Sequence, residues 1–105
     1  MNYSWIDKSV TIITGGASGI GQAIANLAAR NGAISLIADV NEEAGTKTAE
    51  SLQRDGYQAL FVKTDVTKPD EILALVNQAK TMGPIRYLAN SAGLQTYGTI
   101  DTTTE

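Results

Sequence analysis

The feature that most constrains this chain is a cluster of glycines placed between an apolar run and a helical pattern. The cluster reads Thr14-Gly15-Gly16-Ala17-Ser18-Gly19-Ile20-Gly21, and the apolar run before it covers residues 10–13. Glycines at the start of a helix leave backbone N–H groups open to a phosphate, and the helix dipole favours negative charge there. The sequence therefore predicts a phosphate-binding strand–turn–helix unit near its start.

Each main glycine of the cluster has an expected role. Gly15 turns the chain at positive φ, Gly19 lets a diphosphate approach the backbone, and Gly21 allows the helix to pack closely on the sheet. The spacing is G-x-x-x-G-x-G, not the commoner G-x-G-x-x-G, and a plain flexible turn is the alternative. A mononucleotide P-loop is excluded, because Gln22 and Ala23 stand where that motif has Lys and Ser or Thr.

Apolar runs and helical patterns alternate along the chain. Runs typical of strands buried on both faces cover residues 10–13, 33–38, 59–62 and 85–89. Helical patterns begin at Gly19, after the capping residue Asn41, and near Thr67. The second is the weakest, because Gly45 lies inside it and its apolar face is thin. The order βαβαβαβ predicts a doubly wound, Rossmann-like parallel sheet in three α/β/α layers, with about four strands present.

Composition excludes several classes of function. The 105 residues include no Cys and no His, which removes thiol nucleophiles, disulfides, the usual zinc sites and any Ser-His-Asp triad. The formal net charge is -3 and the eight Lys and Arg residues are scattered, whereas a nucleic-acid partner needs a clustered basic face. No apolar run approaches the roughly 18 residues that span a bilayer, and the first residues do not resemble a signal peptide. We therefore expect a cytoplasmic protein without nucleic-acid, membrane or metal partners.

Asp39 follows the second expected strand and stands 20 residues beyond Gly19. A carboxylate at this place accepts hydrogen bonds from the hydroxyls of an adenosine ribose. At about 5 Å from a 2′-phosphate it would cost roughly 3 kcal/mol per unit charge, and neither Ser18 nor Val40 offers a cation. The sequence thus predicts NAD(H) in preference to NADP(H). The alternative role is an acid at the start of the helix after Asn41, and the two roles are compatible.

Four motifs together resemble the short-chain dehydrogenase/reductase family. The glycine cluster matches T-G-x-x-x-G-I-G, and the other three motifs each follow a strand: Asp39, Asp65-Val66 and Asn90-Ser91-Ala92-Gly93. They stand in the family's order and extend over essentially the whole chain. One departure is visible at Ser91, where the family's N-N-A-G motif has Asn. Ser is smaller but still forms hydrogen bonds, so we expect local adjustment there and no loss of binding.

The resemblance implies a set of cofactor-binding residues. They are Gly15, Ser18, Gly19, Ile20, Gly21, Asp39, Asp65, Val66, Asn90, Ala92 and Gly93. The glycine cluster would line the pyrophosphate, Asp65 and Val66 would meet the adenine, and Asn90 with the two small residues near it would close over the ribose and steady the sheet. Two structural alternatives stay open. Asp65 is otherwise a loop acid ahead of Thr67, and Asn90 a buried amide that satisfies loop backbone.

The family's catalytic residues are absent from this chain. They are a later Ser and a Tyr-x-x-x-Lys pair, but the residues four positions after the four tyrosines are Asp7, Phe61, Ser91 and Asp101. The resemblance therefore implies that residues 1–105 are the amino-terminal part of a single NAD(P)-binding Rossmann domain, inactive alone.

The whole enzyme would transfer hydride between NAD(H) and a small-molecule carbonyl or secondary alcohol, as a homodimer or homotetramer. Two alternatives from other classes remain. One is a truncated dinucleotide-binding module without catalysis, and the other is a nucleotide-binding regulatory protein of the same fold that does not use nicotinamide. Titration with NADH and NADPH distinguishes the second alternative from the dehydrogenase.

Overall fold

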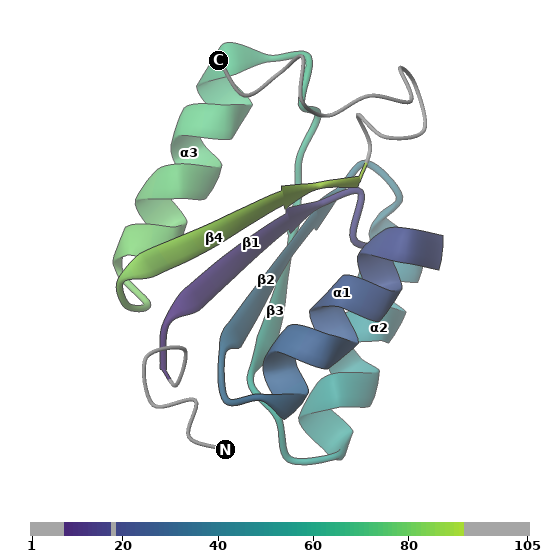
Figure 1. Ribbon diagram of the computed structural model, residues 1–105. Helices are drawn as coiled ribbons and strands as arrows, with labels where there is room; N and C mark the ends of the chain where they lie inside the picture. Colours follow the sequence, from purple (N-terminus) through teal and green to yellow (C-terminus); the bar gives the residue numbers. More distant parts are fainter. Residues whose placement is uncertain (1–7, 18, 92–105) are drawn as a thin grey trace.

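The computed structural model describes residues 8–17 and 19–91, in which strands and helices alternate (Figure 1). The elements are β1 (Val10–Thr14), α1 (Gly19–Arg30), β2 (Ile34–Asp39), α2 (Glu42–Arg54), β3 (Ala59–Lys63), α3 (Pro69–Lys80) and β4 (Ile85–Asn90). Each strand begins and ends within one residue of its predicted run. None of these three helices is long and apolar enough to cross a membrane.

The four strands form one parallel sheet in the order β3-β2-β1-β4. The chain leaves β1 toward β2 and β3, then returns past β1 to β4, so the direction of winding reverses beside β1. Figure 1 shows α1 and α2 on one face of the sheet and α3 on the other. The predicted doubly wound α/β fold is therefore confirmed, and in such sheets ligands bind beyond the carboxyl ends of the strands where the winding reverses.

Two apolar layers hold the helices to the sheet. The layer under α1 and α2 contains Ile13, Ala25, Ala29, Ile37, Ala49, Leu52 and Ala59. The layer under α3 contains Val10, Ile12, Leu36, Ala38, Leu75 and Ala79. Successive strand residues point to opposite faces, so Ile12 and Ile13 fall in different layers. Because both faces of the first strand are covered, all five of its residues are buried.

The helix that the sequence indicated most weakly, α2, is present and capped. The side-chain oxygen of Asn41 accepts a hydrogen bond from the N–H of Ala44 at 3.1 Å, which confirms the predicted cap. Gly45 lies over the ring of Phe61 from β3, and a Cβ atom built on this glycine would overlap the ring. The glycine that weakened the helical pattern is therefore what lets the aromatic ring pack beneath the helix.

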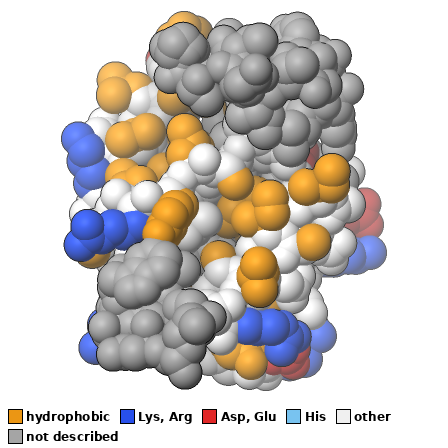
Figure 2. Space-filling view, viewed as in Figure 1, with side chains coloured by type: hydrophobic (Ala, Val, Ile, Leu, Met, Phe, Trp, Pro, Cys, Tyr) orange, Lys and Arg blue, Asp and Glu red, His pale blue; other side chains and the backbone are white. Residues whose placement is uncertain are grey.

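The side of the molecule that carries β4 and α3 exposes large apolar side chains. Leu88 of β4 is 68% exposed and Leu73 of α3 is 61% exposed. Figure 2 shows hydrophobic side chains on the face formed by these two elements. An apolar hollow of about 380 Å³ lies between β4, β1 and α3, with Val66 at its edge. Exposed apolar surface of this kind favours association with another surface.

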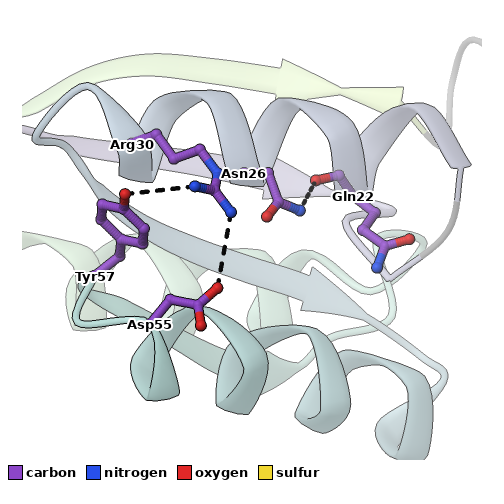
Figure 3. Close-up of polar contacts among 5 residues, drawn as sticks. All are labelled: Gln22, Asn26, Arg30, Asp55 and Tyr57. Atoms are coloured by element: carbon purple, nitrogen blue, oxygen red, sulfur yellow. Dashed lines mark hydrogen bonds and ion pairs between the residues drawn. The ribbon is translucent and has the colours of Figure 1, made fainter.

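The carboxyl ends of α1 and α2 are joined by a small polar cluster. Arg30 at the end of α1 forms an ion pair with Asp55 at 3.7 Å and a 3.4 Å hydrogen bond to the hydroxyl of Tyr57 (Figure 3). The guanidinium also lies 5.1 Å from the centroid of the Tyr57 ring. All three contacts are solvent-exposed and contribute little each. They fix the relative position of the two helices at the end away from the glycine cluster.

Candidate functional site

Several predicted site residues meet at the carboxyl end of the sheet. Asp39 and Asn90 are the last residues of β2 and β4, on either side of Thr14 at the end of β1. The glycine-rich turn continues from Thr14 to the start of α1. Three further predicted residues lie outside the part of the chain that the structure describes, namely Ser18, Ala92 and Gly93.

The first part of the turn is fixed by β2. The N–H of Gly15 donates to the carbonyl oxygen of Ala38 at 2.7 Å, and the N–H of Gly16 donates to the same oxygen at 3.4 Å. Gly15 has a φ of 72°, the left-handed conformation that the sequence predicted for it. Because its N–H is taken up inside the protein, Gly15 shapes the turn and offers no amide to a ligand.

Close packing makes two other glycines necessary. A Cβ atom on Gly21 would overlap the carbonyl oxygen of Gly15 and lie 2.6 Å from Oγ of Ser91. Gly21 does allow a close approach, but to the turn and to Ser91, whereas the sequence predicted packing on the sheet. A Cβ on Gly16 would lie 2.8 Å from Cγ2 of Ile37. This contact of Gly16 depends on the position of β2 beneath the turn and is not visible in the sequence pattern.

The amino-terminal end of α1 faces open space. The first N–H groups of any helix lack partners within the helix, and α1 begins at Gly19. A Cβ atom on Gly19 would meet no heavy atom of residues 8–17 and 19–91 within 4 Å, and Ile20 is 54% exposed. The amides of Gly19 and Ile20 are thus at the surface, at the positive end of the helix dipole, where an anionic group is stabilised.

Asp39 connects the end of β2 with the glycine-rich turn. Its Oδ2 accepts from the N–H of Ala17 at 3.1 Å, and its Oδ1 accepts from the N–H of Asn41 at 3.0 Å. The second bond serves the start of α2, which was the alternative role, and the first directs the carboxylate toward the turn. A carboxylate has about four acceptor positions, so two backbone bonds leave capacity for further donors.

Asp65 is engaged within its own loop. Its Oδ1 accepts from the hydroxyl of Thr67 at 2.6 Å and from the N–H of Thr67 at 2.9 Å. These two hydrogen bonds lower the pKa of the Asp65 carboxyl from its usual 3.8. The structure therefore shows the loop-acid role that was the alternative for Asp65, and a contact with adenine stays a prediction. Val66, next in the loop, is 42% exposed.

Lys63 at the end of β3 and Lys68 in the loop after it lie on the side of the site next to Val40, which follows Asp39. Lys63 ends β3 and pairs with Asp39 in the register of β2 and β3. Together with Lys68, it lines a hollow of about 480 Å³ beside the ends of these strands, which is also lined by Val40 and by two acids, Asp65 and Glu71. Cations near the end of β2 reduce the repulsion that Asp39 would exert on a 2′-phosphate. Only the pairing of the third strand with the second reveals them.

Asn90 holds the end of β4 against the end of β1. Its Oδ1 accepts a hydrogen bond from the Thr14 hydroxyl at 2.9 Å, and the two residues are partners in the strand register. This is the satisfied-amide role that was the alternative for Asn90, and it steadies the sheet as the resemblance implied. Contact with a ribose stays a prediction.

Ser91, the residue that departs from the family motif, is fully built into the site. It is 1% exposed, and its Oγ lies 2.6 Å from the carbonyl oxygen of Thr14 and 2.9 Å from that of Gly15. The single hydroxyl proton is shared between these two backbone acceptors. The expected local adjustment is thus a direct anchor of β4 to the glycine-rich turn, a role that the motif alone did not indicate.

Comparison with known proteins agrees with this geometry. The sequence pattern of the family described as short chain dehydrogenase matches residues 9–105. A cis-4-hydroxycyclohexanecarboxylate dehydrogenase of Sinomonas cyclohexanicum is 43% identical over 88 residues, which cover 83% of this chain and 35% of that protein. An oxidoreductase of Thermotoga maritima is 36% identical over 96 residues, covering 90% of this chain and 38% of that protein. The chain thus spans little more than a third of these relatives.

Solved structures show the same arrangement. A short chain dehydrogenase/reductase from Burkholderia phymatum, determined in complex with NAD, superposes with a TM-score of 0.76 at 34% identity, over 79% of this chain and 30% of that one. A hydroxysteroid dehydrogenase from Escherichia coli superposes with a TM-score of 0.76 at 34% identity, over 81% of this chain and 37% of that one. At this identity the likeness extends beyond the general fold to the sequence itself.

Proposed function

The chain belongs to the short-chain dehydrogenase family of oxidoreductases, and on this premise we propose that it provides the NAD(H)-binding part of an enzyme that transfers hydride between NAD(H) and a carbonyl or secondary alcohol. The observation that carries the proposal is the open amino-terminal end of α1 beside the carboxylate of Asp39. Residues 1–105 would then be the amino-terminal part of a single dinucleotide-binding domain, in a cytoplasmic homo-oligomer.

The residues at the site fit a dinucleotide. A diphosphate needs backbone donors with room above them, and the amides of Gly19 and Ile20 meet both needs. Asp39 has free acceptor capacity for ribose hydroxyls, and Val66 is exposed on the loop proposed to meet the adenine. The Burkholderia phymatum neighbour, which was determined with NAD, supports the same ligand class here. When bound, NAD supplies the hydride acceptor, and this chain binds and orients it.

The proposed preference for NAD(H) over NADP(H) rests on the charge of Asp39. A 2′-phosphate next to this carboxylate would be repelled, by roughly 3 kcal/mol per unit charge at about 5 Å. Lys63 and Lys68 oppose that repulsion from the neighbouring hollow. Both lysines are solvent-exposed, so salt screens their attraction for a 2′-phosphate. The repulsion from the Asp39 carboxylate, which is held against the turn, is screened less. We therefore keep NAD(H) as the preferred cofactor.

Fluorescence titration of the full chain with NADH and NADPH tests the proposal. We expect saturable binding of NADH, and binding of NADPH that is weaker by at least about tenfold. This factor is the part of the repulsion between Asp39 and the 2′-phosphate that Lys63 and Lys68 do not offset. ATP in a parallel titration is the control for a mononucleotide site. Absence of NADH binding, or tighter binding of ATP, would contradict the proposal and favour a regulatory protein that does not use nicotinamide.

Turnover separates the dehydrogenase from a binding module without catalysis. The protein in which these residues occur is assayed for NADH formation with a panel of secondary alcohols. NADH binding without turnover of any alcohol, or of any carbonyl in the reverse direction, would favour the binding module.

A further inference from the structure

The hydroxyl of Ser91 stands where three parts of the site meet. Its Oγ lies 2.6 Å from the carbonyl oxygen of Thr14, at the end of β1, and 2.9 Å from that of Gly15 in the turn. A Cβ on Gly21, in the first turn of α1, would lie 2.6 Å from the same Oγ. Ser91 directly follows β4, so one buried hydroxyl links β4, the glycine-rich turn and the helix.

The Gly15–Gly16 segment is held from two sides. On the side of β2, the carbonyl oxygen of Ala38 accepts from the N–H of both glycines, at 2.7 and 3.4 Å. On the side of β4, the Ser91 hydroxyl is close to the carbonyl oxygen of Gly15 at 2.9 Å. With both its N–H and its C=O bonded, Gly15 has a fixed orientation. The turn that follows then enters α1 at one angle, and the amides of Gly19 and Ile20 are held in place.

We propose that Ser91 is a positioning residue for the diphosphate of the cofactor. It does not touch the ligand, and it acts by fixing the Gly15 carbonyl and with it the amino-terminal end of α1. Without the hydroxyl, the partly buried carbonyl of Gly15 loses its side-chain donor, and the turn is free to adopt other conformations. Backbone donors must be held in place before a ligand arrives in order to bind it well. This inference rests on the proposed function.

A comparison of ligands with and without phosphate isolates this role. In Ser91→Ala, we expect the dissociation constants of NADH and ADP to rise about tenfold, the size of one lost hydrogen bond. That of adenosine, which lacks the diphosphate, should change less than about twofold. The dissociation constants are measured on the full chain, by fluorescence for NADH and by NMR chemical shifts for ADP and adenosine.

Ser35→Ala is the matched control. The Ser35 hydroxyl is 0% exposed and donates to the carbonyl oxygen of Ala25, in the same helix α1, at 2.8 Å. This variant loses the same kind of buried hydrogen bond away from the turn. We expect it to destabilise the protein to urea about as much as Ser91→Ala while leaving the ratio of ADP to adenosine affinity unchanged.

The outcomes separate this inference from the proposed function. If the unchanged protein binds neither NADH nor ADP, both are wrong. If it binds them and Ser91→Ala behaves like Ser35→Ala, the positioning role alone is overturned. Should Ser91→Ala fail to fold, Ser91→Cys replaces it, because the thiol fills the site but donates weakly. Ser91→Cys should then lose ADP affinity and keep adenosine affinity, and equal loss of both overturns the inference.

Discussion

Ala17 donates its backbone N–H to Oδ2 of Asp39 at 3.1 Å, across 22 positions of the sequence. The end of β2 and the glycine-rich turn are therefore one unit before any ligand is present. Asp39 acts in two ways in this arrangement. Its oxygen holds the turn, and its negative charge acts on whatever group approaches the adenosine ribose.

Asp39→Asn separates these two effects. The single amide oxygen can still accept from Ala17, at the cost of the bond from the N–H of Asn41, and the charge is gone. We therefore expect the ratio of NADH to NADPH affinity to fall by at least about tenfold. Asp39→Ala loses the anchor as well and should weaken both cofactors. Fluorescence titration with the two cofactors measures the ratio. An unchanged ratio in Asp39→Asn would show that Lys63 and Lys68, not this charge, decide the cofactor.

Gly19 provides a test of the open helix end. It has a φ of 30°, and no heavy atom of the described residues lies within 4 Å of a built Cβ. Gly19→Ala therefore costs only about 1 kcal/mol of backbone strain and adds a methyl group at the helix end where the diphosphate is proposed to bind. We expect loss of NADH binding by more than about tenfold. Gly56→Ala is the matched control, since Gly56 has a φ of 92° and equally open surroundings. It should lose similar stability to urea and no NADH affinity.

Much of the fold could be predicted from the sequence because it depends on local pattern. Apolar runs without alternation indicated strands covered on both faces, and the alternation with helices indicated parallel pairing. The positive φ of Gly15 and the cap at Asn41 are also local properties, decided by neighbours in the chain. The strand bounds, which agree with the predicted runs to within one residue, depend on the same local pattern.

The remaining features depend on contacts between residues distant in the sequence. Ser91 reaches the carbonyl of Thr14 across 77 positions, and no spacing rule indicates which backbone oxygen it meets. Lys63 comes near Asp39 only because β3 pairs with β2 in one register. Asp65 accepts its hydrogen bonds from a residue only two positions away. The sequence still could not indicate whether the carboxylate binds this neighbour or a ligand.

Gly45 of α2 should resist the substitution that ordinarily stabilises helices. Alanine is favoured over glycine by about 1 kcal/mol inside a helix. Here its methyl group would overlap the ring of Phe61, so we expect Gly45→Ala to lower the free energy of unfolding by about 1–3 kcal/mol, the usual cost of overpacking. Combining it with Phe61→Leu should recover part of that loss. Urea unfolding is measured for the unchanged protein, the two single variants and the double variant, which gives the coupling free energy between the two positions. If the two single changes in unfolding free energy simply add up in the double variant, the contact is contradicted.

The Asp65 carboxyl predicts a specific dependence on pH. Hydrogen bonds from the Thr67 hydroxyl, and then from its N–H, lower the pKa of Asp65 in the folded chain below the usual 3.8. A group with a depressed folded pKa stabilises the fold above its unfolded pKa, and this contribution is lost as the pH falls through the folded value. The effect is confined to pH values near 4 and below, and it is small because the carboxyl is exposed.

Thr67→Val tests this assignment, because it removes the hydroxyl and keeps the backbone N–H. We expect the pKa of Asp65 to rise toward 3.8, and the part of the acid-induced loss of stability that this carboxyl causes to become smaller. NMR titration of the carboxyl carbon gives the pKa, and urea unfolding between about pH 5 and 2 gives the stability. Thr81→Val is the control, since the Thr81 hydroxyl donates to the carbonyl oxygen of Gln78 at the other end of α3. An Asp65 pKa that responds equally to both substitutions would mean that the Thr67 hydroxyl is not its cause.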